Sequence, residues 1–162
     1  MSSEIFAVVR EVQLPLLAVL LLLGAVTKMS GRAADTGGLA VLVSERLRRP
    51  SAVATGLLEA ALGVGLLVSN GLPGEAARAL TAIVFAVSVV VLFLVRRRDP
   101  EAGCGCFGGL SRAPVGRRTL TRAGLLSAAA LTTLGLEPAG WQVLASPTPS
   151  HAWVLGAELL IL

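Results

Sequence analysis

Long apolar stretches constrain the fold of this 162-residue chain more than any other feature. No charged residue occurs between Ala79 and Val95, and the stretch Leu14–Leu23 is rich in leucine. At about 1.5 Å of helical rise per residue, some 20 apolar residues cross the roughly 30 Å hydrocarbon core of a bilayer. Charged residues make up only 15% of the chain, against about 25% in typical soluble domains. We therefore expect an integral membrane protein.

The apolar runs predict an all-α fold, a polytopic membrane four-helix bundle in a single domain over residues 1–162. Pro15 would lie in the opening turn of the first span, where its missing N–H costs nothing. The run 39–43 is too short to cross a bilayer and predicts an interfacial helix. The C-terminal apolar run, 152–162, is also too short to span. The four expected spans cover about residues 12–29, 51–69, 76–95 and 119–136.

The basic residues are concentrated in two of the expected loops. Lys28 and the arginines of 46–49 belong to the first loop, whereas Arg96–Arg98 and Arg117–Arg118 flank the third. Four spans place these loops on one side, and the positive-inside rule makes that side cytoplasmic. Arginine greatly exceeds lysine, which suggests a GC-rich bacterial genome. Together with the apolar spans, this predicts a multi-pass protein of the bacterial plasma membrane. The net charge of +4 does not indicate nucleic-acid binding, because the basic residues adjoin apolar runs and the chain has no Tyr.

Both cysteines, Cys104 and Cys106, lie in the glycine-rich segment Gly103–Gly109. A disulfide that closes so small a ring adds little stability, because disulfide stabilisation grows with loop length. Reversible thiol exchange is the better use, and the flanking arginines favour the reactive thiolate. Two other interpretations are open. The thiols could be inert interfacial residues, or they could supply half of a metal site, although no His or third Cys lies nearby.

One carboxylate, Glu59, lies inside the second expected span. An ionised group at that depth is costly and usually faces a partner or a cavity. Lys28 ends the first span on the same side, so we expect a Lys28–Glu59 ion pair. The pair could be structural, or it could serve as a proton relay or polar pocket. Small residues at intervals of four would let the second span approach its neighbours closely; they are Ala52, Gly56 and Ala60.

Three motifs of the chain are similar to those of a known family. They are Cys104-Gly105-Cys106-Phe107-Gly108, Gly24–Lys28 at the end of the first span, and Leu58–Gly63 in the second. Over about residues 14–136 the chain resembles the methylamine-utilisation MauE family, which belongs with the DoxX-like four-helix membrane proteins. The resemblance implies a DoxX-like bundle with a Cys-containing loop between helices three and four.

The resemblance also implies a role in disulfide chemistry. MauE-like proteins are associated with maturation of a disulfide-rich periplasmic dehydrogenase subunit, often beside a thioredoxin-like partner. Carried over to this chain, Cys104 and Cys106 would be the catalytic redox pair, and Glu59 and Lys28 would be supporting polar residues. Arg122 is a further supporting residue, but Ala123 follows it where we expect asparagine in the family.

The leading interpretation is therefore a membrane thiol–disulfide redox protein, either an oxidoreductase or its electron-transfer subunit. It would act with a thioredoxin-like protein or an exported disulfide-containing protein. The charge rule places the cysteines in the cytoplasm, whereas an exported protein acquires its disulfides outside. Either electrons cross the bundle, for which a quinone is a possible carrier, or the family does not follow the charge rule. The alternatives are a non-catalytic membrane assembly factor and a small transporter. The transporter is disfavoured because only one intramembrane carboxylate and one lysine are available to couple transport to ion movement.

Overall fold

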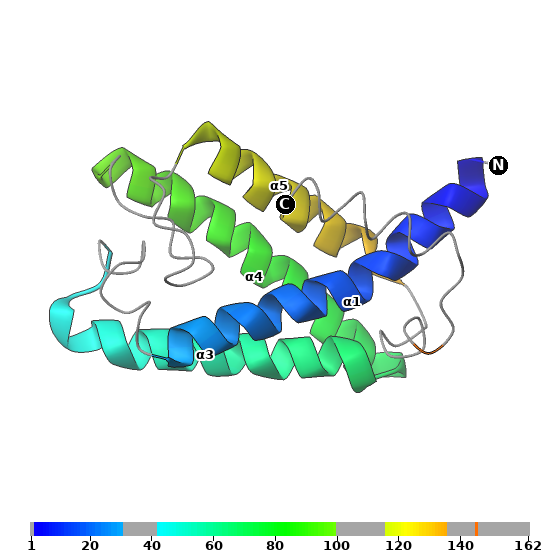
Figure 1. Ribbon diagram of the computed structural model, residues 1–162, viewed down its shortest axis with the longest axis horizontal. Helices are drawn as coiled ribbons and strands as arrows, with labels where there is room; N and C mark the ends of the chain where they lie inside the picture. Colours follow the sequence, from blue (N-terminus) through cyan, green and yellow to red (C-terminus); the bar gives the residue numbers. More distant parts are fainter. Residues whose placement is uncertain (1, 31–41, 100–115, 136–144, 146–162) are drawn as a thin grey trace.

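The structure is a computed structural model, and it describes residues 2–30, 42–99, 116–135 and 145. These residues form four α-helices, which pack as an antiparallel bundle (Figure 1). The all-helical fold agrees with the expectation from the sequence. The helices are α1 (Ser2–Met29), α3 (Glu45–Val68), α4 (Gly71–Arg98) and α5 (Arg117–Thr132).

Three of these helices are long and apolar enough to cross a membrane. The segment Val12–Met29 of α1 has a mean hydropathy of 1.9, and α3 and α4 reach 1.8 and 2.6. The structure therefore supports a multi-pass membrane protein. The helix α5 has 16 residues, which corresponds to about 24 Å and is shorter than the hydrocarbon core. The fourth span therefore stays a prediction, as does the DoxX-like character of the bundle.

Two prolines lie within helices. The helix α1 begins at Ser2, so the expectation that Pro15 occupies an opening turn is wrong. Pro50 is likewise inside α3, which begins at Glu45. An internal proline removes one backbone hydrogen bond and can cost about 3 kcal/mol. The helix α1 continues past Pro15 because side chains on both sides of it are buried, among them Leu14 and Leu17 at 0% exposure.

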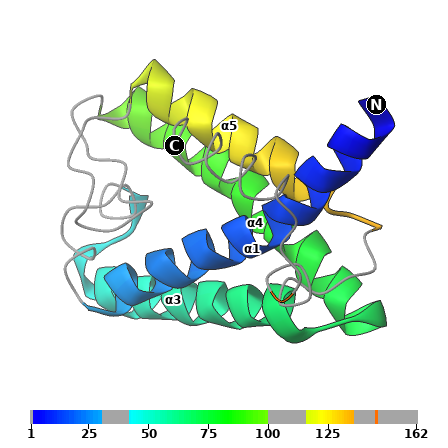
Figure 2. The same ribbon diagram turned by 45° about the vertical axis from the view of Figure 1, so that its right-hand side comes forward.

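The helices α1 and α3 pack closely along glycines of α3 (Figure 2). A Cβ atom at Gly63 would lie 2.9 Å from Leu22 Cγ, and one at Gly56 would lie 3.1 Å from Met29 Cγ. The absence of side chains at these positions lets the two backbones approach, as in other small-residue interfaces of membrane helices. Gly56 and Ala52 are buried and Ala60 is half-buried, so the predicted small-residue face does pack inside the bundle.

The apolar interior consists of two clusters. The main core draws on all four helices and contains Leu14, Leu17, Ala18, Leu21, Leu62, Leu66, Ala77, Ala82, Leu126 and Ala130. The second cluster consists of Leu92 and Val95 with Leu42, Val91, Leu120 and Ala123 packed against them. On α4, Ser88 lies in sequence between Phe85, which packs on the main core, and Leu92 of the second cluster. Ser88 therefore lies on α4 between the residues that belong to the two clusters.

One end of the bundle is strongly basic. The C-terminal ends of α1 and α4 and the N-terminal ends of α3 and α5 meet there, at the left in Figures 1 and 2. We call it the basic end. The first and third connections therefore share an end of the bundle, as the four-span topology predicts. Its arginines are Arg46, Arg48, Arg49, Arg96, Arg97, Arg98, Arg117, Arg118 and Arg122.

At the opposite end, a carboxylate ties α4 to the end of α5. Glu75 accepts hydrogen bonds from Arg78 Nη1 at 3.1 Å and from the backbone N–H of Gly135 at 3.1 Å. Gly135 has φ +75°, a left-handed conformation that favours glycine just after a helix. The contact holds the C-terminal turn of α5 against the start of α4.

Candidate functional site

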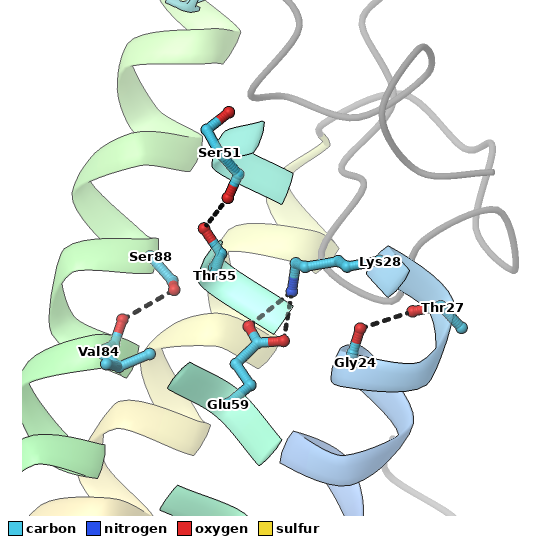
Figure 3. Close-up of polar contacts among 8 residues, drawn as sticks. All are labelled: Gly24, Thr27, Lys28, Ser51, Thr55, Glu59, Val84 and Ser88. Carbon is cyan, nitrogen blue, oxygen red and sulfur yellow. Dashed lines mark hydrogen bonds and ion pairs between the residues drawn. The ribbon is translucent and has the colours of Figure 1, made fainter. Parts of the chain in front are cut away.

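A buried ion pair joins α1 and α3 in the half of the bundle nearer the basic end. Lys28 Nζ donates to Glu59 Oε1 at 2.5 Å and to Oε2 at 2.7 Å (Figure 3). The side chains are only 8% and 12% exposed. The predicted pairing of Lys28 with Glu59 is thus confirmed. Two opposite charges so close together neutralise one another where an isolated charge would be costly.

Gly24 makes room for this pair. A Cβ atom at Gly24 would lie 2.9 Å from Glu59 Oε2 and 3.6 Å from Lys28 Nζ. Gly24 and Lys28 are four residues apart and share one face of α1, so the carboxylate lies against bare backbone beside the lysine that binds it. Sequence reasoning assigned Gly24 only to a family motif. Its spacing of four from Lys28 was the signal that could have identified its role.

Two hydroxyl-bearing residues, Thr55 and Ser88, lie near the ion pair in Figure 3. Thr55 lies one turn before Glu59 on α3, and the Ser88 hydroxyl is directed from α4 toward α3 in Figure 3. Thr55 donates to Ser51 O at 2.7 Å, and Ser88 donates to Val84 O at 2.8 Å. Each hydroxyl donates its proton to a backbone carbonyl of its own helix, so its oxygen can still accept a hydrogen bond from another group. We call Lys28, Glu59, Thr55 and Ser88 the polar layer.

Arg122 lies apart from the polar layer. It is exposed on α5, and among the described residues α5 does not pack against α3, which carries Glu59. Arg122 instead lines an open hollow near the start of α5, together with Arg117, Arg118, Thr121 and Leu125. The structure therefore brings together two of the three predicted supporting residues and leaves the third at the surface of the basic end.

Cys104 and Cys106 lie outside the described residues. The chain enters their segment from the end of α4 at Arg98 and leaves it into α5 at Arg117. Both of these positions are at the basic end (Figure 1). The segment that carries the thiols is thus anchored on both sides among arginines. The predicted interfacial helix at 39–43 lies mostly outside the described residues, and the C-terminal run 152–162 lies wholly outside them.

Residues 6–135 match the family model of Methylamine utilisation protein MauE. The chain belongs to the MauE family. The match spans α1, α3, α4 and α5 together with the segment that carries Cys104 and Cys106, so it confirms the resemblance noted from the motifs. Membership in the MauE family indicates a membrane protein connected with methylamine utilisation. No curated protein and no solved structure matched the chain.

Proposed function

We propose that this MauE-family protein is a membrane thiol–disulfide redox protein with Cys104 and Cys106 as its redox pair. The observation that carries the proposal is the attachment of the cysteine segment at both sides to the basic end, between Arg98 and Arg117. A positive environment favours the thiolate, which is the form that attacks disulfides. From the four glycines in Gly103–Gly109 we expect a backbone without bulky neighbours around the two sulfurs, which would suit exchange with a partner.

The exchange involves two electrons and two protons. When the Cys104–Cys106 disulfide accepts electrons from a partner dithiol, a partner thiolate attacks one sulfur and forms a mixed disulfide. The second partner thiolate then resolves it, which leaves Cys104 and Cys106 reduced and the partner oxidised. The direct partner we propose is a thioredoxin-like protein on the same side of the membrane as Cys104 and Cys106. An exported protein that acquires a disulfide during maturation would exchange electrons with the pair across the bundle. A membrane quinone is the proposed final acceptor, because it takes up two electrons and two protons.

The other predicted residues would support this chemistry from the bundle. Lys28 and Glu59 hold α1 and α3 in register near the basic end through their ion pair. Arg122 adds positive charge at the start of α5, where the cysteine segment ends. By the positive-inside rule we place this end in the cytoplasm of a bacterial plasma membrane.

Thiol trapping tests the proposal. Membranes with the full chain are quenched with acid and alkylated with a maleimide mass tag after oxidising or reducing growth, with the Cys104→Ser/Cys106→Ser variant as the control. We expect the pair to shift between dithiol and disulfide, and each single serine variant to accumulate a mixed disulfide with its partner. A pair that stays in one state, with partner maturation intact in the double serine variant, would favour a non-catalytic membrane assembly factor instead.

A further inference from the structure

One face of α3 changes from polar to apolar at Glu59. Between the basic end and Glu59, this face carries four polar residues at spacings of three, four and four. We call these residues the polar stripe; they are Arg48, Ser51, Thr55 and Glu59. These spacings place side chains on one side of a helix. Past Glu59 the same side continues with Leu62 and Leu66, which are 5% and 2% exposed and belong to the main core.

The polar stripe faces the interior of the bundle. Ser51, Thr55 and Glu59 are half-buried, whereas Val53 and Leu57 on the opposite side of α3 are exposed. In a membrane, that exposed side contacts lipid. Lys28 of α1 reaches Glu59 at the inner end of the stripe, and Ser88 of α4 is directed toward it (Figure 3). Three helices therefore contribute polar groups at the depth where the stripe ends.

The polar stripe has hydrogen-bonding capacity that the protein does not use. Arg48 Nε is buried and has no hydrogen-bond partner in the described part of the chain. The Ser51 and Thr55 hydroxyls donate to Arg48 O and Ser51 O, so their oxygens remain available as acceptors. Buried polar atoms that lack a protein partner are normally satisfied by ordered water, which needs two to four polar neighbours. A row of donors and acceptors one helical turn apart meets this requirement.

We propose that the polar stripe is a hydrated path from the basic end to the Lys28–Glu59 pair, closed beyond the pair by the main core. The path is about 16 Å long, because Arg48 and Glu59 are eleven residues apart on one helix. It gives water, and with it protons, access to the ion pair from one side of the membrane only. The proposal does not depend on the thiol chemistry of Cys104 and Cys106.

The closure follows from the packing beyond Glu59. Leu62 and Leu66 of α3 contact a core that contains Leu17 and Leu21 of α1. Leu17 has no exposed surface and Leu21 is 3% exposed. Water does not remain in a site that offers it no polar partners. A path closed in this way lets the pair exchange protons with one compartment without conducting them across the bilayer.

Cysteine accessibility tests the path. The Cys104→Ser/Cys106→Ser chain has no other cysteine, and single cysteines are introduced into it as Ser51→Cys, Thr55→Cys and, on the facing helix, Ser88→Cys. The matched controls are Val53→Cys and Leu57→Cys, at similar depth on the lipid side, and Leu66→Cys, beyond the ion pair. Ser44→Cys, at an exposed residue just before α3, marks the basic end. The probe is a charged, membrane-impermeant methanethiosulfonate, applied to vesicles of each orientation.

Methanethiosulfonates react with the thiolate, which forms in water and not in lipid or a dry core. We expect Ser51→Cys, Thr55→Cys and Ser88→Cys to react from the basic end only, at least about tenfold faster than Val53→Cys, Leu57→Cys and Leu66→Cys. A tenfold ratio corresponds to a thiol pKa difference of one unit. Equal rates at Thr55→Cys and Leu57→Cys would overturn the path. Fast modification of Leu66→Cys, or of Thr55→Cys from the opposite end, would overturn its closure.

Discussion

Lys28 and Glu59 are 31 residues apart in the sequence, and their side chains join two antiparallel helices through both carboxylate oxygens. The pair is mostly buried, so each charge depends on the other for its solvation. A buried pair of this kind contributes little net stability relative to apolar residues of similar size, but removal of one partner is costly. The contact therefore specifies how α1 and α3 align more than it strengthens the bundle.

The first prediction concerns the two charges. Lys28→Met or Glu59→Leu alone should lower the free energy of unfolding by about 3–5 kcal/mol, because each leaves an unpaired buried charge. The double variant Lys28→Met/Glu59→Leu should recover most of that loss. Denaturant titration in detergent micelles, followed by circular dichroism, measures all four free energies. If the double variant lost as much free energy of unfolding as the two single variants together, the side chains would not be coupled.

The second prediction concerns the glycine beside the pair. Gly24→Ala adds a Cβ atom 2.9 Å from Glu59 Oε2 and should cost roughly 1–3 kcal/mol, as overpacking typically does. Gly124→Ala is the matched control, because nothing lies within 4 Å of its added Cβ atom. The control should be neutral or up to about 1 kcal/mol stabilising, from helix propensity alone.

The origin of the Gly24→Ala cost can be checked within the same series. If the cost comes from displacement of the carboxylate, Gly24→Ala should be much less destabilising in the Lys28→Met/Glu59→Ala background, in which the crowded carboxylate is gone. An equal cost in both backgrounds would place the clash elsewhere in the α1–α3 interface.

The third prediction links the pair to the proposed thiol chemistry. Glu59→Gln keeps the side-chain size and a hydrogen-bond acceptor but can no longer carry a proton. We expect reoxidation of reduced Cys104 and Cys106 to slow by roughly 10²-fold, the smaller end of what a proton-transferring group contributes. Timed alkylation after removal of reductant measures the rate. Glu75→Gln is the control, since that carboxylate lies at the opposite end of the bundle. An unchanged rate in Glu59→Gln would restrict the pair to a structural role.

The fourth prediction is the side of the membrane that the basic end faces. An impermeant maleimide should label Cys104 and Cys106 in inverted vesicles and not in intact spheroplasts, because arginine-rich loops remain in the cytoplasm. Leu72→Cys in the Cys104→Ser/Cys106→Ser background should show the reverse pattern. Leu72 is 88% exposed in the first turn of α4, away from the basic end. Labelling of the loop cysteines from outside would contradict the cytoplasmic assignment.

Several features of this protein were predictable from its amino-acid sequence alone. The stretches that form the three long apolar helices are recognisable from composition, because transfer of a helix into lipid depends mainly on the sum of its side-chain contributions. The Lys28–Glu59 pair was predictable too, since a carboxylate deep in a span needs a partner and one lysine lies at a comparable depth. The motif around Cys104 and Cys106 indicated the MauE family, which the family match confirms.

Other features depend on how the helices rotate and slide against one another. The sequence does not show that Gly24 makes room for Glu59, that Ser88 of α4 is directed toward the hydroxyl-bearing face of α3, or that Arg122 is exposed away from the ion pair. It also misplaced Pro15, because packing on both sides of a proline can sustain a helix that local propensity would end. Hydrophobicity decides which segments leave water, whereas contacts between side chains decide the register of the helices. Those contacts exist only once the chain has folded.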